Sequence, residues 1–70
     1  MSRYFFIVTY SDQREIGDPK GTLLPNDTAA IESARRIIDD LLEERLPGEP
    51  EPSIIIKNEA GEIVYRFPSN

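Results

Sequence analysis

The stretch "RYFFIVTY", residues 3–10, decides which fold this sequence can adopt. Nearly every position in it is aromatic or β-branched, and such residues favour an extended strand over a helix. Successive side chains of a strand point to opposite faces of its sheet. One face therefore carries Tyr4, Phe6, Val8 and Tyr10, and the other carries Arg3, Phe5, Ile7 and Thr9. Both faces are partly apolar, so the question is which one forms the core and what the other one does.

The segments that follow indicate a turn, a second short strand and a link to a helix. "SDQ" at 11–13 is typical of a turn, and residues 14–17 predict a short strand. "DPKG" at 18–21 predicts a type I turn, because proline fixes φ at the second position and glycine suits the last. We interpret "TLLP" at 22–25 as the connection to the helix.

The helix has clear start and stop signals. Asn26, Asp27 or Thr28 can accept hydrogen bonds from the free N–H groups of its first turn. "PGEP" at 47–50 ends it, because proline cannot continue the hydrogen-bond ladder. Apolar residues between these signals recur at spacings of three and four, which predicts one buried stripe. The stripe contains Ala30, Ile31, Ala34, Ile37, Ile38, Leu41 and Leu42.

The remaining segments, residues 53–58 and 62–67, predict a hairpin around "NEAGE". A loop of this length with Gly61 near its end suits a type I turn followed by a glycine bulge. One helix stripe must bury itself on one face of a sheet. We therefore expect an α+β fold, a ββαββ two-layer sandwich with a four-stranded, mainly antiparallel sheet and one helix packed on one face. The single domain spans residues 1–70.

Strand order and core follow from pairing and alternation. Every neighbour is antiparallel if residues 3–10 lie between the strands at 14–17 and 53–58, with 62–67 at the far edge. The more apolar set of each strand should face the helix. The expected core consists of Tyr4, Phe6, Val8, Ile54, Ile56, Ile63, Tyr65 and Phe67 against Ala34, Ile37, Ile38 and Leu41.

Composition excludes several function classes. The chain has 70 residues, no Cys and no His, so disulfides, thiol chemistry and the usual zinc ligands are excluded. Its formal charge of −5 opposes binding to phosphate backbones. No apolar run is long enough to span a membrane, and the start of the chain does not resemble a signal peptide. We expect a cytoplasmic protein without membrane contact, cofactor or bound metal.

Three stretches, "MSRYFFIV", "GTLLPND-TAA" and "KNEAGEIVYRFP", resemble a known family in their order and spacing. That family consists of short bacterial proteins that begin Met-Pro-Arg-Tyr-Phe-Phe-His-Val and form a domain of unknown function. The resemblance covers nearly the whole chain and implies a fold and a bacterial cytoplasmic setting, but no activity. The sequence departs from the pattern at Ile7, where the family often has His.

The sheet face opposite the helix is the candidate functional surface. A single helix cannot cover both faces, and the second face has an apolar centre inside a charged rim. We expect it to bind another protein or a second copy of the chain. The expected interaction residues are Arg3, Phe5, Ile7, Ile55, Lys57, Val64 and Arg66, with Glu62 also at the rim.

Two other functions receive weaker support from the residues. "RYFFIVTY" partly matches the strand motif of RNA-recognition domains, which leaves single-stranded nucleic-acid binding through Phe5 as the alternative. The small residues that this motif requires are replaced by Tyr4 and Phe6. Catalysis is not expected, since no nucleophile with an evident base is present. The acids of the helix are read as a solvated face on which Arg35 and Arg36 pair with Asp39 and Asp40.

Overall fold

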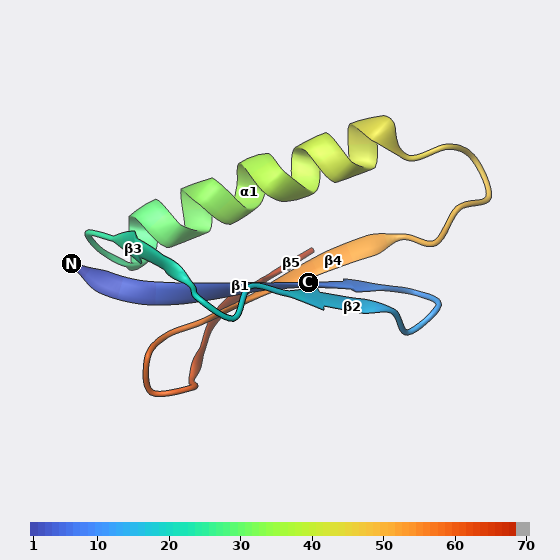
Figure 1. Ribbon diagram of the computed structural model, residues 1–70. Helices are drawn as coiled ribbons and strands as arrows, with labels where there is room; N and C mark the ends of the chain where they lie inside the picture. Colours follow the sequence, from blue (N-terminus) through green and yellow to red (C-terminus); the bar gives the residue numbers. More distant parts are fainter. Residues whose placement is uncertain (69–70) are drawn as a thin grey trace.

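The structure is a computed structural model that describes residues 1–68, in which one helix lies across one face of an antiparallel sheet (Figure 1). The other face of the sheet has no covering layer in this part of the chain. The expected α+β architecture is confirmed, with a fifth short strand added to the four that were predicted. The elements are β1 (Ser2–Tyr10), β2 (Glu15–Gly17), β3 (Thr22–Leu24), α1 (Asp27–Glu44), β4 (Pro52–Lys57) and β5 (Ile63–Phe67).

The sheet has the order β2-β1-β4-β5, which confirms the predicted order. All of its strand pairs are antiparallel. β1 is central because β4 pairs with one of its edges while β2 and β3 share the other. β2 pairs with Ile7–Thr9, and β3 pairs with Ser2–Tyr4. We did not predict β3, since three residues are too few to show alternation.

The helix boundaries follow the predicted signals. Asn26 is the N-cap, and its side-chain oxygen accepts a hydrogen bond of 2.9 Å from the backbone N–H of Ala29. This bond satisfies one of the N–H groups that the first turn leaves without a partner. At the other end the helix stops at Glu44, and Arg45 has extended backbone angles. Pro47 and Gly48 then carry the chain toward β4.

The core lies between α1 and the middle of the sheet. Ala30, Ala34 and Ile38 are spaced four residues apart along the buried line of the helix. Ile54 and Ile56 of β4 lie opposite and are fully buried. The two alanines let the helix approach the sheet closely, so the isoleucines lose all contact with water. Partly buried residues complete this cluster: Phe6, Val8, Leu24, Ile31, Val64, Tyr65 and Phe67.

Two expectations for the helix were wrong. Ile37 and Leu42 of the predicted stripe are 36% and 49% exposed, and neither joins the core. Ile37 lies about 100° around the helix from Ile38, outside the buried line. Arg35 forms no ion pair with Asp39 in residues 1–68, nor does Arg36 with Asp40. The Arg35 guanidinium lies over the Phe67 ring instead, 5.9 Å from its centroid. Surface ion pairs gain little energy, so an aromatic face can compete for the cation.

A β-bulge in β5 reverses two face assignments. Tyr65 pairs with Ile56, but Lys57 pairs with Ile63, so one extra residue is inserted between these pairs. Val64 is that residue, and it packs against the core although we expected it on the opposite face. Ile63, expected in the core, is 50% exposed and shares the side of Lys57. A bulge interrupts the two-residue period on which the assignment depended.

Two of the three predicted turns are described by their hydrogen bonds. In the β4–β5 loop, Gly61 has φ of 82° and donates a 3.0 Å hydrogen bond to the Asn58 carbonyl. The Asn58 N–H in turn donates to the Glu62 carbonyl, so the predicted turn with a glycine bulge is confirmed. At 18–21 the side chain of Asp18 accepts a hydrogen bond from the Lys20 N–H, and no backbone bond joins the Asp18 carbonyl to the Gly21 N–H. A type I turn does not require that bond, so the turn at 18–21 stays a prediction.

One hydrogen bond joins the sheet to the start of the helix. The Tyr4 hydroxyl donates to Oδ1 of Asp27 over 2.6 Å. Tyr4 is only 3% exposed. This hydrogen bond raises the pKa of the Tyr4 hydroxyl above its ordinary value, and burial and the nearby charges of Asp27 and Glu59 raise it further. The structure therefore favours the neutral phenol, which can donate to the carboxylate.

This contact predicts a loss of stability at high pH. The folded-state pKa of Tyr4 lies above the unfolded value of about 10. Its contribution is therefore fully present below pH 10 and is lost as the pH rises through the folded-state pKa. Urea unfolding of the parent and of Tyr4→Phe at several pH values from about 8 to 11.5 tests this. We expect the parent to lose more stability than Tyr4→Phe over that range, and parallel losses would contradict the role of Tyr4.

Candidate interaction surface

The sheet face turned away from α1, here called the open face, is defined by strand register. Tyr4 is buried under the helix, so its neighbour Phe5 points to the other side. Residues that pair directly across antiparallel strands share a face. The pairs Phe5–Lys57, Ile7–Ile55 and Ile55–Arg66 therefore extend the open face across the sheet. Its residues are Arg3, Phe5, Ile7, Thr9, Glu15, Gly17, Leu23, Ser53, Ile55, Lys57, Ile63 and Arg66.

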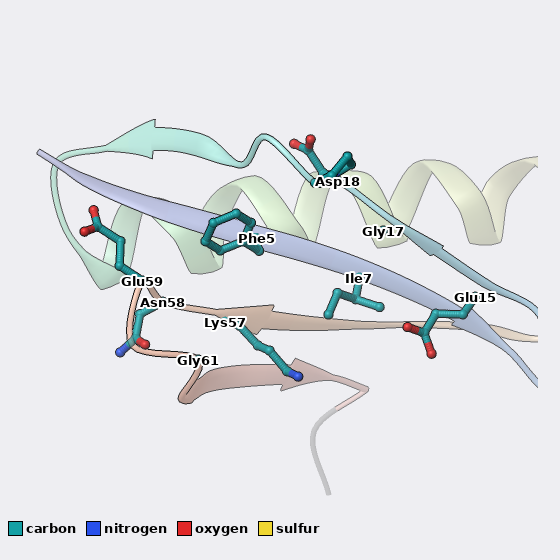
Figure 2. A pocket seen from close by; sticks show the side chains of 10 residues that line it. Phe5, Ile7, Glu15, Gly17, Asp18, Lys57, Asn58, Glu59 and Gly61 are labelled. Carbon is teal, nitrogen blue, oxygen red and sulfur yellow. The ribbon is translucent and has the colours of Figure 1, made fainter.

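A hollow of about 440 Å³ lies on the open face (Figure 2). Phe5 and Ile7 form its floor. The segment 17–19 that leaves β2 forms one wall, and residues 57–61 at the β4–β5 loop form the other. Figure 2 shows the side chains of Phe5, Ile7 and Lys57 standing on the sheet with the helix behind it. The hollow thus has an apolar floor with charged side chains in both walls, and it is open to solvent.

The structure brings together most of the residues predicted from the sequence. Six of the seven expected residues lie on the open face, and Val64 is the exception because of the bulge. Phe5, Ile7 and Ile55 are half-buried among their neighbours in the sheet. Arg3 is already engaged within the chain, since its guanidinium donates a 2.6 Å hydrogen bond to the Lys20 carbonyl. Its backbone N–H donates to Glu59.

Sequence reasoning missed several residues on or beside this surface. Ile63 and Leu23 are the most exposed apolar residues on it, at 50% and 51%. Ile63 was misplaced by the bulge, and Leu23 was missed because β3 was not recognised. Gly17 and Pro19 line the hollow. A proline and a glycine beside a short strand do indicate an exposed bend, which is the one signal that could have located this wall.

Charges of opposite sign lie at opposite edges of the open face. Glu15 and Asp18 lie at the β2 edge, while Lys57 and Arg66 lie on β4 and β5. The ion pairs within residues 1–68 are elsewhere: Arg14 with Asp12 at 2.8 Å and Arg45 with Glu51 at 3.8 Å. Lys57 and Arg66 form no ion pair with another side chain of residues 1–68.

Residues 1–68 form neither a cluster of metal ligands nor a helix that could cross a membrane. The acids of the helix, Asp39, Asp40, Glu43 and Glu44, are all exposed. In the described part of the chain, no group of three or more acidic side chains is arranged to hold a metal ion. Over residues 1–68, no helix combines the length and the apolar character that a membrane crossing requires.

The fold and its bare sheet face define a small α+β domain with one helical layer. A family model described as a domain of unknown function (DUF6894) matches residues 3–69, and the chain belongs to this family. The resemblance to a domain of unknown function is thereby confirmed. No curated protein matches the chain, and no solved structure does so either.

Gly21 sets how closely the chain can pass beside Phe5. Its φ is 72°, in the left-handed region that favours glycine. A Cβ at this position would lie 2.9 Å from a ring carbon of Phe5 and 2.7 Å from Cγ of Arg3. Both distances are below normal contact. The strand that follows can therefore reach β1 only if residue 21 has no side chain.

We predict that Gly21→Ala destabilises the fold more than Gly48→Ala. Gly48 also has positive φ, 89°, but its Cβ would meet nothing within 4 Å. Left-handed strain alone should cost about 1 to 2 kcal/mol at Gly48, and overpacking should bring the cost at Gly21 to about 2 to 5 kcal/mol. Urea unfolding of both variants measures the difference. Equal losses would show that the approach to Phe5 imposes no constraint.

Proposed function

We propose that the chain is a non-catalytic binding module and that the open face is its contact surface for another protein molecule. The observation that carries this proposal is the apolar centre of the face, Phe5, Ile7 and Ile55, with exposed Ile63 beside it. Charged side chains surround this centre. An apolar centre with a polar rim is the usual anatomy of a protein interface. The geometry also allows a partner to lie flat, since the strands form one continuous surface.

Nucleic-acid binding through Phe5 is less well supported. The side chains of Glu15, Asp18 and Glu59 line the same hollow as Phe5. Their negative charge, added to a net charge of −5, opposes a phosphate backbone. A fluorescence titration with a single-stranded oligonucleotide separates the two functions, because phosphate contacts weaken steeply with salt. The family resemblance further leads us to place the module in the bacterial cytoplasm, which fractionation of cells producing the tagged chain would test.

The proposed function predicts that Ile7→Lys abolishes association and preserves the fold. Ile7 lies at the centre of the open face, so a lysine there would be buried without a partner in any complex. On the free chain the ammonium can reach water. Ile16→Lys is the matched control, because Ile16 is 59% exposed on the neighbouring strand and pairs with Val8 on the helix side. Circular dichroism reports the fold of each variant.

Association is measured in two ways for the parent and both variants. Sedimentation across a concentration range detects self-association, and affinity capture with the tagged chain detects other proteins. We expect Ile7→Lys to lose a self-association or a bound protein that Ile16→Lys keeps. If Ile7→Lys unfolds, Ile63→Lys at the exposed edge of the face takes its place. The proposal fails if no association of the parent is sensitive to substitution on the open face.

A further inference from the structure

A row of four residues crosses the middle of the open face, from a glycine at one edge to an arginine at the other. The register places Gly17, Ile7, Ile55 and Arg66 side by side on β2, β1, β4 and β5. Glu15 and Asp18 flank Gly17 at the β2 edge. Along this row the face is therefore flanked by carboxylates at the β2 edge, apolar in the middle and positive at the β5 edge. Such a surface can be complementary to itself.

We propose that the occupant of the open face is a second copy of this chain, an inference that rests on the proposed function. The two copies are related by a two-fold axis that runs along the strands, between β1 and β4. Rotation about this axis lays β1 of the second copy on β4 and β2 on β5. Ile7 then contacts Ile55 of the second copy, and Arg66 lies over the second copy's Gly17, between its two carboxylates. Each contact occurs twice, as two-fold symmetry requires.

Charge selects this axis over the other one that is available in the plane of the sheet. A two-fold axis running across the strands through the same row would place Arg66 against Arg66 of the second copy. It would also place the acidic β2 edge against itself. Like charges held together in an interface cost energy, whereas the axis along the strands pairs each cation with a carboxylate. Either axis keeps the strands of the two sheets roughly aligned, which is a common geometry for packed sheets, so charge decides between them.

The shape of the face agrees with the same arrangement. A Cβ built on Gly17 would meet no atom within 4 Å, so there is open space where Arg66 of the second copy would lie. Ile63 occupies the row of Lys57 and Phe5 on the far edge. The rotation brings it over the hollow beside Pro19 of the second copy. Ile63, the most exposed apolar residue of β5, therefore lies in the second copy's hollow of about 440 Å³.

A charge exchange between two variants tests the arrangement. Arg66→Glu and Glu15→Arg each place like charges at both ends of a homodimer, and we expect each to weaken dimerisation about tenfold or more. Mixed in equal amounts, the two variants regain both ion pairs and should form a heterodimer with nearly the parent's affinity. Arg36→Glu, on the exposed surface of α1, makes the same change in net charge as Arg66→Glu, from −5 to −7, and should dimerise like the parent.

Sedimentation velocity from about 10 μM to about 1 mM, at about 0.15 M salt, measures the parent, each variant, the mixture and Ile7→Lys. Restored association in the mixture, but not in either variant alone, supports the proposed axis. The proposed axis is wrong if Ile7→Lys abolishes the parent's dimer but the mixture of Arg66→Glu and Glu15→Arg does not associate. If the parent stays monomeric, the proposed dimer is wrong. The proposed function still holds in that case if affinity capture finds a bound protein that Ile7→Lys releases. If there is neither a dimer nor such a protein, the dimer and the proposed function are both wrong.

Discussion

One helix can cover only one face of the sheet, and most of this structure follows from that constraint. The helix presents Ala30 and Ala34 to the sheet, and these small side chains allow close contact with Ile54 and Ile56. The covered face thereby obtains a dry core with few residues. Tyr4 adds a directional contact, because its hydroxyl bonds Asp27 at the first turn of the helix. The opposite face receives no such layer from residues 1–68 and keeps its apolar centre within reach of solvent.

Sequence patterns predicted the elements whose signals are local and strong. The β1 stretch is long enough for its alternation to place Tyr4 and Phe5 on opposite faces. Once β1 was assigned, pairing with β4 placed most residues of the open face correctly. The helix start at Asn26 depended on a capping side chain that acts within one turn. The strand order followed from requiring antiparallel neighbours, and it agrees with the structure.

What the sequence could not predict depends on contacts between distant segments. Ile63 and Val64 lie on the opposite faces from those predicted because β5 has a bulge where it pairs with β4. Nothing in "EIVYRF" marks the position of this bulge. β3 is a strand only because it meets the start of β1, and its approach requires the bare backbone of Gly21. Ile37 fits the apolar period of the helix, but the buried line is narrower than the stripe.

The central position of β1 has a consequence for the order in which the fold can form. Its partner β4 lies far away in the sequence, since the paired residues run from Tyr10–Pro52 to Phe5–Lys57. A chain emerging from the ribosome makes "RYFFIVTY" early but cannot complete its main pairing until β4 follows, after the whole helix. Closing so long a loop carries an entropic cost that slows folding. During that interval the aromatic strand has only the short β2 and β3 to cover one of its edges, so it is also the segment that the nascent chain must keep from aggregating.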